Sequence, residues 1–211
     1  MLCLHGYHGS AAILRQQMQP LFGDLRSTVE FIEVDAPSLA AGDFGWWHGN
    51  FPVSQGEYRG WQRTRDWLID LFDRQGPFDG VFGFSQGAAL TGVLPGLRAP
   101  DGKVSERTPL VFDFAIMAGG FRSEAVEHKR LFTVKEGYQL PSLHIMGSAD
   151  TVVPIADSLT LARQFAAPTV LEHGGGHVIA ATSEVRAHVV AFLRHRAERG
   201  ATSTQGGSGG D

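Results

Sequence analysis

Short apolar runs and segments of helical periodicity alternate along the whole chain. The apolar runs lack the strict alternation of apolar and polar residues that a half-buried strand would have. Uninterrupted runs favour strands covered on both faces, as in a parallel sheet. The pattern therefore predicts six strands, at residues 2–4, 29–34, 80–84, 111–117, 142–146 and 169–171.

The segments between these runs carry apolar residues three or four positions apart, which is the spacing of one helix face. Ser10 is the predicted N-cap of the first helix, and Pro95 is expected to end the third helix. Strands that alternate with helices indicate an α/β fold with right-handed crossovers, here a mostly parallel sheet of about six strands flanked by helices. The predicted helices lie within residues 10–25, 58–72, 88–94, 154–165 and 185–193.

Length and composition predict that these elements form one domain. A chain of 211 residues with 43% hydrophobic content can bury a single core without disulfide bonds or metals. We expect this domain to span residues 1–196. Residues 197–211 turn to Gly, Ser and Thr with almost no apolar side chain, so we expect a disordered tail. Two long connections, 36–57 and 119–140, are candidates for functional loops.

Charge and cysteine content argue against several classes of protein. The net charge is −4 and the sequence has no Lys- or Arg-rich run, so nucleic acid is not an expected partner. No apolar stretch is long enough for a membrane span, and we expect neither a span nor a signal peptide. The one cysteine, Cys3, lies in an apolar run and is expected in the core. Because it cannot form an intrachain disulfide, a cytoplasmic location is the expectation.

Residues 83–87 read Gly-Phe-Ser-Gln-Gly and match the motif G-x-S-x-G. The motif is short, and residues 206–210 match it too, inside the glycine-rich tail. Only Ser85 follows an apolar strand and precedes a helix of small residues, the context of a nucleophile on a tight strand-to-helix turn. Gly83 and Gly87 provide the lack of bulk that such a turn needs. Ser85 is the predicted nucleophile; the alternative is an ordinary strand–turn–helix with glycines for packing.

A serine hydroxyl needs a base to take its proton, and the base needs an acid that fixes its tautomer. In the α/β-hydrolase arrangement the acid and then the histidine follow the nucleophile along the chain. Asp150, after the fifth predicted strand, is the predicted acid, and His177, in a glycine-rich loop after the sixth, is the predicted base. His173 is the rival base, and Asp157 and Glu172 are the rival acids. The three predicted groups share the carboxyl edge of the sheet, where open α/β sheets place their sites.

Backbone N–H groups are the predicted oxyanion hole. Tyr7 follows a strand that ends in His-Gly, and Gln86 follows the nucleophile. In α/β-hydrolases the oxyanion hole consists of one N–H from a loop after a strand and one from the residue after the nucleophile, and these two N–H groups match that arrangement. An ordinary strand-exit turn is the alternative for the segment before Tyr7.

We expect no metal and no cofactor. The closely spaced histidine pairs His5/His8 and His173/His177 lack a third ligand. His144 is expected in the core, and the remaining histidines are expected on the surface: His48, His128, His188 and His195.

Several short sequence blocks lie along the chain: Leu-His-Gly-Tyr at 4–7, Val-Asp-Ala-Pro at 34–37, Trp-Trp at 46–47, Gly-Pro-Phe-Asp-Gly at 76–80, Gly-Phe-Ser-Gln-Gly-Ala at 83–88, Pro-Ser-Leu-His at 141–144, Gly-Ser-Ala-Asp at 147–150 and Gly-Gly-His at 175–177. Together these blocks resemble the small α/β-hydrolases called the family of serine hydrolases. The resemblance covers residues 2–193 and implies the α/β-hydrolase fold, with esterase or thioesterase activity on acyl substrates. Relatives include an ovarian-cancer-associated candidate hydrolase and fungal thioesterases that release polyketides. Ser85, Asp150 and His177 match the family's triad positions, whereas the residue at Tyr7 and segment 36–57 vary among such proteins.

Aromatic side chains in the two long connections are candidates for binding an acyl chain. Each buried methylene would contribute about 0.8 kcal/mol. The alternative is that these side chains form the loops' own small core. The candidates are Phe44, Trp46, Trp47, Phe51, Phe121 and Tyr138.

The predicted function is hydrolysis of carboxylic esters through an acyl-serine intermediate. The expected partner is a small-molecule ester or thioester. One alternative is a thioesterase or acyltransferase that serves a biosynthetic pathway. Another, from a different class, is a non-catalytic ligand-binding protein on a hydrolase fold.

Overall fold

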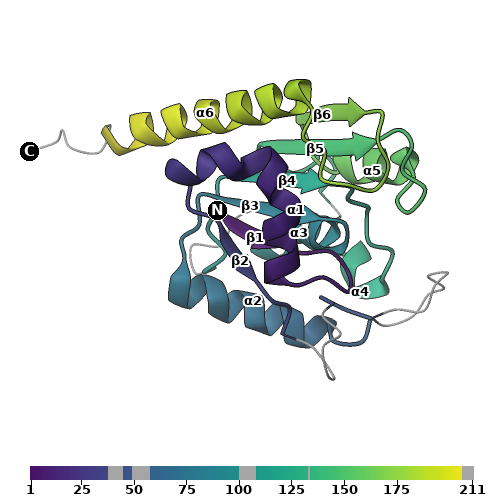
Figure 1. Ribbon diagram of the computed structural model, residues 1–211. Coiled ribbons are helices and arrows are strands. Elements are labelled where there is room, and N and C mark those ends of the chain that lie inside the picture. Colours follow the sequence, from purple (N-terminus) through teal and green to yellow (C-terminus); the bar gives the residue numbers. More distant parts are fainter. Residues whose placement is uncertain (38–44, 49–57, 100–107, 133, 206–211) are drawn as a thin grey trace, which may run out of the picture.

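A six-stranded sheet forms the centre of the computed structural model (Figure 1). The structure describes residues 1–37, 45–48, 58–99, 108–132 and 134–205, with the backbone alone for 200–205. All neighbouring strands are parallel, in the order β2-β1-β3-β4-β5-β6. The predicted α/β class and sheet are thus confirmed. The strands are β1 Leu2–Leu4, β2 Ile32–Val34, β3 Gly80–Phe84, β4 Phe114–Ala118, β5 Ser142–Gly147 and β6 Pro168–His173.

Helices cover both faces of this sheet (Figure 1). Helices α1 (Ala11–Phe22) and α6 (Ser183–Gln205) share one core cluster with alternate residues of the strands. Helices α2 (Trp61–Gln75), α3 (Gln86–Arg98) and α5 (Ile155–Ala162) pack on the opposite face. A short 3-10 helix, η1 (Gly23–Ser27), follows α1, and the four-residue α4 (Val126–Lys129) lies between β4 and β5.

The inner strands β1, β3 and β4 are uninterrupted apolar runs because both of their faces are buried. Cys3 and Phe82 contact the layer that contains α1, whereas Leu2, Leu4 and Val81 contact the layer that contains α2 and α3. All of these side chains are fully buried. A strand with one exposed face would need polar residues at every second position.

Of two helix ends predicted from the sequence, the structure confirms one and contradicts the other. The Ser10 hydroxyl accepts a hydrogen bond from the Ile13 N–H at 3.2 Å, so the predicted N-cap is confirmed. The prediction that Pro95 ends the third helix is wrong, because α3 continues to Arg98. A proline removes only its own N–H, and the Pro95 carbonyl still accepts the Ala99 N–H at 3.0 Å.

The C-terminal helix is longer than the sequence predicts. Segment 197–205, expected to be part of a disordered tail, continues α6 to Gln205. Ala197, Glu198 and Arg199 are good helix formers, so the helix extends past its last apolar contacts. Residues 206–211 lie outside the described residues.

Candidate active site

Ser85 lies on a strained turn between β3 and α3. Its backbone has φ 55° and ψ −118°, a conformation that side-chain-bearing residues rarely adopt. A Cβ added to Gly83 would lie 2.3 Å from the Gly87 oxygen, and one added to Gly87 would lie 2.1 Å from the Leu4 oxygen. The turn therefore excludes any side chain at these two positions, as the motif predicts.

The structure brings the three predicted reactive side chains into one hydrogen-bonded row. His177 Nε2 lies 2.9 Å from Ser85 Oγ, and His177 Nδ1 lies 2.6 Å from Asp150 Oδ2. The Asp150 side chain is 2% exposed and that of His177 is 16% exposed. Three segments that are distant in sequence meet here because β3, β5 and β6 all end at the same edge of the sheet.

Asp150 is held as a carboxylate by its hydrogen bonds. Burial alone would raise its pKa, but N–H donors outweigh burial and lower the pKa below its usual value. Oδ1 accepts the backbone N–H groups of Val153 at 2.8 Å and Val152 at 2.9 Å, and Oδ2 faces His177. An ionised Asp150 stabilises the His177 tautomer that carries its proton on Nδ1, which leaves Nε2 free to accept the Ser85 proton.

The rival residues do not join the row. His173 Nδ1 accepts the Gly175 N–H at 3.1 Å, so this buried ring fixes the glycine loop that carries His177. Glu172 is exposed on the edge strand β6, and Asp157 is exposed in the first turn of α5.

Gly119, at the end of β4, supports the His177 ring. Its φ is +56°, and a Cβ at this position would lie 3.1 Å from His177 Cε1. The His177 imidazole therefore packs against the backbone of Gly119, where a side chain would crowd it. Sequence reasoning missed this residue, although two glycines directly after an apolar strand (119–120) are a visible signal.

The loop after β1 passes beside Ser85. A Cβ added to Gly6 would lie 3.2 Å from Ser85 Cβ. The buried His5 fixes this loop: Nε2 accepts the Ala36 N–H at 3.1 Å, so Nδ1 carries the proton and donates to the Gly6 oxygen at 2.7 Å. Burial lowers the pKa of His5, which favours this neutral form.

The side chain of Gln86 connects the turn at Ser85 to the tryptophan segment, Trp46–Trp47. Its oxygen accepts the Trp46 backbone N–H at 2.9 Å, and its amide donates to the Trp47 oxygen at 2.8 Å. The Trp46 indole N–H donates in turn to the His5 oxygen at 2.8 Å. The turn, the tryptophan segment and the loop after β1 are thus one connected unit. Sequence reasoning considered only the backbone of Gln86.

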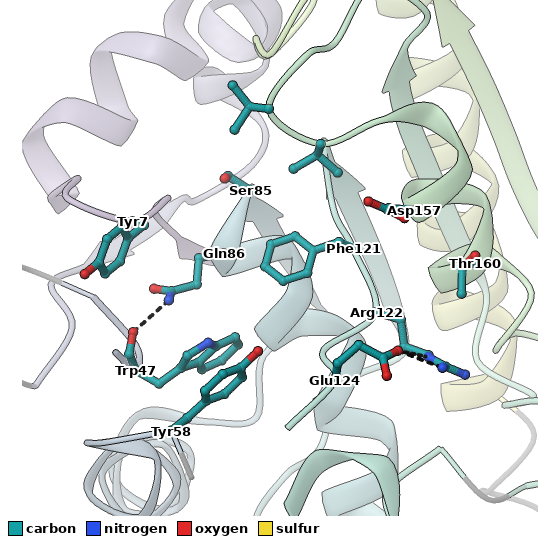
Figure 2. Close-up of a pocket in the computed structure, with 12 residues that line it drawn as sticks. Tyr7, Trp47, Tyr58, Ser85, Gln86, Phe121, Arg122, Glu124, Asp157 and Thr160 are labelled. Carbon is teal, nitrogen blue, oxygen red and sulfur yellow. Dashed lines mark hydrogen bonds and ion pairs between the residues drawn. The ribbon is translucent and has the colours of Figure 1, made fainter. Parts of the chain in front are cut away.

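A cavity of about 340 Å³ opens at Ser85 (Figure 2). Half of the residues that form its wall are aromatic or aliphatic. Figure 2 shows Trp47 and Tyr58 on one side of Phe121, and the Arg122–Glu124 ion pair beyond them. The lining residues are Tyr7, Trp47, Tyr58, Ser85, Gln86, Phe121, Arg122, Glu124, Val152, Val153, Asp157 and Thr160.

The structure separates the six aromatic candidates. Trp47 and Phe121 line the cavity, whereas Trp46 is fully buried and is not among the lining residues. Tyr138 lies elsewhere, packed on Phe165 with 5.7 Å between ring centroids, because its connection has already returned to the amino end of β5. Phe44 and Phe51 lie outside the described residues.

One histidine expected on the surface is buried instead. His128 has no exposed surface, because α4 turns it inward against Trp47, Tyr58 and Trp61. The helix has only four residues, too few for a periodic pattern to reveal its inward face. His144 is buried, as expected, and Nε2 lies 3.1 Å from Ser142 Oγ.

In the described part of the chain, no group of three or more His, Cys, Asp and Glu side chains is placed to hold a metal ion. None of the helices in that part has the length and apolarity to cross a membrane.

Solved structures with the same architecture define the class as an α/β-hydrolase fold. The acyl-protein thioesterase 2 of Zea mays is 19% identical with a TM-score of 0.66, and 92% of each chain is covered. The carboxylesterase of Bacillus cereus is 16% identical with a TM-score of 0.60, over 92% of this chain and 86% of the other.

Sequence comparison then gives the family. The family model described as "Serine hydrolase (FSH1)" matches residues 1–189, and the chain belongs to this family. Human esterase OVCA2 is 31% identical over 225 residues, 94% of this chain and 96% of its own sequence. Esterase CG5412 of Drosophila melanogaster is 30% identical over 212 residues, 93% of this chain and 74% of its own. Membership of this family supports ester hydrolysis as the general activity.

Proposed function

We propose that the protein hydrolyses carboxylic esters through an acyl intermediate on Ser85. One observation carries the proposal: the hydrogen-bonded row from Ser85 Oγ through His177 to Asp150, at 2.9 and 2.6 Å. It begins on a strained turn that exposes the hydroxyl to a cavity. These are the parts that nucleophilic catalysis by serine requires.

In the proposed first step Ser85 Oγ attacks the ester carbonyl carbon while His177 Nε2 takes the hydroxyl proton. The tetrahedral intermediate collapses, the bond to the leaving oxygen breaks, and His177 protonates the departing alcohol. Water then attacks the acyl-serine carbonyl and gives a proton to His177, which returns it to Ser85 as the carboxylic acid leaves. Asp150 stabilises the imidazolium in both halves.

The proposed oxyanion hole consists of the N–H groups of Gln86 and Tyr7. Gln86 is the first residue of α3, where N–H groups have no partner within the helix and point to the reacting centre. Tyr7 lines the same cavity, on the loop that approaches Ser85 through Gly6. Losing one such donor costs about 10²–10³ in rate.

The test is steady-state hydrolysis of para-nitrophenyl esters by wild-type protein and by Ser85→Ala. We expect saturable hydrolysis by the wild type and only background release by the variant. Equal rates in the two proteins would contradict the proposal. The control is Ser27→Ala, which changes an exposed serine after α1 and should keep the wild-type rate.

A thioesterase is the second candidate. The Zea mays structure that shares this fold is named an acyl-protein thioesterase, and the same serine chemistry cleaves thioesters. An oxyester and a pantetheine thioester with the same acyl group, measured side by side, would decide between them. The larger kcat/KM identifies the preferred leaving group.

A further inference from the structure

The side chain of Gln86 is a buried amide to which the reaction proposed above gives no role. That reaction uses only the backbone N–H of the residue after the nucleophile, which any residue except proline would supply. Gln86 is 7% exposed, and a buried amide is costly unless it is hydrogen-bonded. Its oxygen accepts the Trp46 N–H at 2.9 Å, and its nitrogen donates to the Trp47 oxygen at 2.8 Å (Figure 2). The amide therefore binds the tryptophan segment through both of its polar atoms.

The tryptophan segment is also held by contacts that do not involve Gln86. The Thr64 hydroxyl, on α2, donates to the Trp46 oxygen at 2.5 Å. The next residue along the chain, His48, pairs with Arg59 through two backbone hydrogen bonds of 2.8 and 2.9 Å. Because these contacts fix the segment against α2, it is a support of known position. The two hydrogen bonds of Gln86 connect the turn at Ser85 to that support.

The same segment contacts the loop that carries the other proposed donor of the oxyanion hole, the Tyr7 N–H. The Trp46 indole N–H donates to the His5 oxygen at 2.8 Å, and this carbonyl lies one peptide before the Tyr7 N–H. The Tyr7 hydroxyl lies 2.9 Å from His48 Nδ1. Both residues of the proposed oxyanion hole are therefore hydrogen-bonded to one stretch of chain, Trp46 to His48.

The strained turn at Ser85 needs such a support. A backbone with φ 55° and ψ −118° persists only where the surrounding contacts hold it in place. Gln86 is the next residue, so a relaxation of the turn would stretch its two side-chain hydrogen bonds. An oxyanion-hole donor is effective within about 2.7–3.1 Å of the developing oxyanion. A relaxed turn would therefore move the Gln86 N–H away from the position where it stabilises charge.

We propose that the side chain of Gln86 is a positioning residue for the oxyanion hole. By binding the tryptophan segment it holds its own backbone N–H and that of Tyr7 in one fixed arrangement around Ser85. Its loss should weaken the binding of the tetrahedral intermediate and leave the binding of a ligand without an oxyanion unchanged. This inference rests on the proposed ester hydrolysis at Ser85 and on the oxyanion hole proposed with it.

The experiment combines hydrolysis of para-nitrophenyl hexanoate with two competitive inhibitors, hexyl trifluoromethyl ketone and the alcohol obtained by reducing it. Ser85 Oγ forms a bond to the ketone carbon while His177 Nε2 takes the hydroxyl proton, and the carbonyl oxygen becomes an oxyanion. The ketone adduct therefore resembles the tetrahedral intermediate. The alcohol has the same chain but no carbonyl group, so it reports binding without an oxyanion.

Gln86→Met keeps a side chain of similar length and removes both hydrogen bonds. We expect kcat/KM to fall by about 10- to 100-fold, less than the loss of a donor would cost, because the donors are displaced and not removed. The Ki of the ketone should rise by the same factor, whereas the Ki of the alcohol should stay within about twofold. A misfolded fraction lowers kcat but changes neither Ki, so the ketone separates positioning from a loss of folded protein.

Two further variants make the test independent of one substitution. Gln86→Asn keeps the amide but is one methylene shorter, so it cannot reach both partners; it should show the same pattern and serves if Gln86→Met does not fold. Gln164→Met is the matched control. The Gln164 amide also donates to a backbone oxygen, that of Thr160 at 3.1 Å, but Gln164 does not line the cavity. This variant should keep the wild-type kcat/KM and both Ki values.

Each failure has a distinct meaning. If the folded wild type does not hydrolyse the ester, the proposed function itself is contradicted. If the Gln86 variants keep the wild-type kcat/KM, or lose it with an unchanged Ki of the ketone, the positioning role is wrong while ester hydrolysis stands. An equal rise in the Ki of ketone and alcohol would also overturn the positioning role, because the side chain would then act on ground-state binding.

Discussion

Two serine–histidine pairs of the molecule are built differently. Ser85 and His177 are 2.9 Å apart, and Ser123 and His128 are 2.6 Å apart. Behind His177 lies the carboxylate of Asp150, whereas His128 is enclosed by aromatic rings. Ser85 has a strained backbone at the start of a helix of 13 residues and faces the cavity, whereas Ser123 is fully buried.

The comparison shows that proximity of a hydroxyl and an imidazole does not by itself define a nucleophile. A base must be able to become positively charged, which a carboxylate permits and an apolar enclosure prevents. The nucleophile must also be reachable and face N–H donors. Only the pair at Ser85 meets these conditions, so we assign the chemistry to that pair alone.

Removing the histidine of each pair should have the most unequal effect. His177→Ala removes the base and should lower kcat by about 10⁴–10⁶. His128→Gln should lower kcat far less, because His128 is fully buried and is not among the residues that line the cavity. Steady-state kinetics on para-nitrophenyl esters measures both; a loss in His128→Gln as large as that in His177→Ala would contradict this assignment.

Neutralising the acid should have the next largest effect. Asp150→Asn keeps the shape but favours the wrong His177 tautomer, and kcat should fall by about 10³–10⁴. Asp73→Asn, at an exposed position of α2 outside the cavity, is a chemically matched control and should lose much less. Equal activity of the two variants would contradict the role of Asp150.

A displaced imidazole should give a smaller loss. Gly119→Ala combines a φ of +56° with a Cβ 3.1 Å from His177 Cε1. A shift of the ring by a fraction of an ångström should lower kcat by about 10- to 100-fold. Gly174→Ala, where an added Cβ meets nothing within 4 Å, should keep most of the activity. Unchanged kcat in Gly119→Ala would show that the His177 position tolerates displacement.

Because His128 is buried as a neutral ring, the free energy of unfolding should depend on pH in the acid range. Burial lowers the pKa of His128 to about 3, whereas a histidine in the unfolded chain has a pKa of about 6.5. Between these values the unfolded chain binds a proton that the folded chain does not. The free energy of unfolding therefore falls with falling pH, by about 1.4 kcal/mol per pH unit.

Urea unfolding measured between about pH 7 and about pH 4 checks this sign. The slope should be shallower in His128→Gln than in the wild type, while His144, which is also buried with a pKa near about 3, contributes equally to both. Identical slopes in wild type and His128→Gln would mean that His128 is not buried as a neutral ring.

The sequence predicts the sheet and the reacting row because both leave local signals. The third strand is predicted to the residue, since its apolar run ends at the strained Ser85. Asp150 and His177 lie in the loops that follow strand signals of their own. The order of the strands in the sheet brings the two residues close to Ser85. The chain order nucleophile, acid, histidine, which is typical of this fold class, already implies that arrangement.

Other features depend on tertiary contacts that no local pattern reports. Tyr138 and Phe121 belong to the same connection, yet only Phe121 reaches the cavity, because the chain crosses from one sheet edge to the other between them. His128 lies on a helix too short for periodicity to reveal its inward face. The amide of Gln86 binds a tryptophan segment 39 and 40 residues away, which spacing alone does not disclose.

Active-site labelling tests the central assignment most directly. The wild type and the variants Ser85→Ala and Ser123→Ala would be treated with a fluorophosphonate and mapped by peptide mass spectrometry. The account predicts one adduct, on Ser85, in the wild type and in Ser123→Ala, and none in Ser85→Ala. An adduct on Ser123, or an unlabelled Ser85 in the folded wild-type protein, would contradict it.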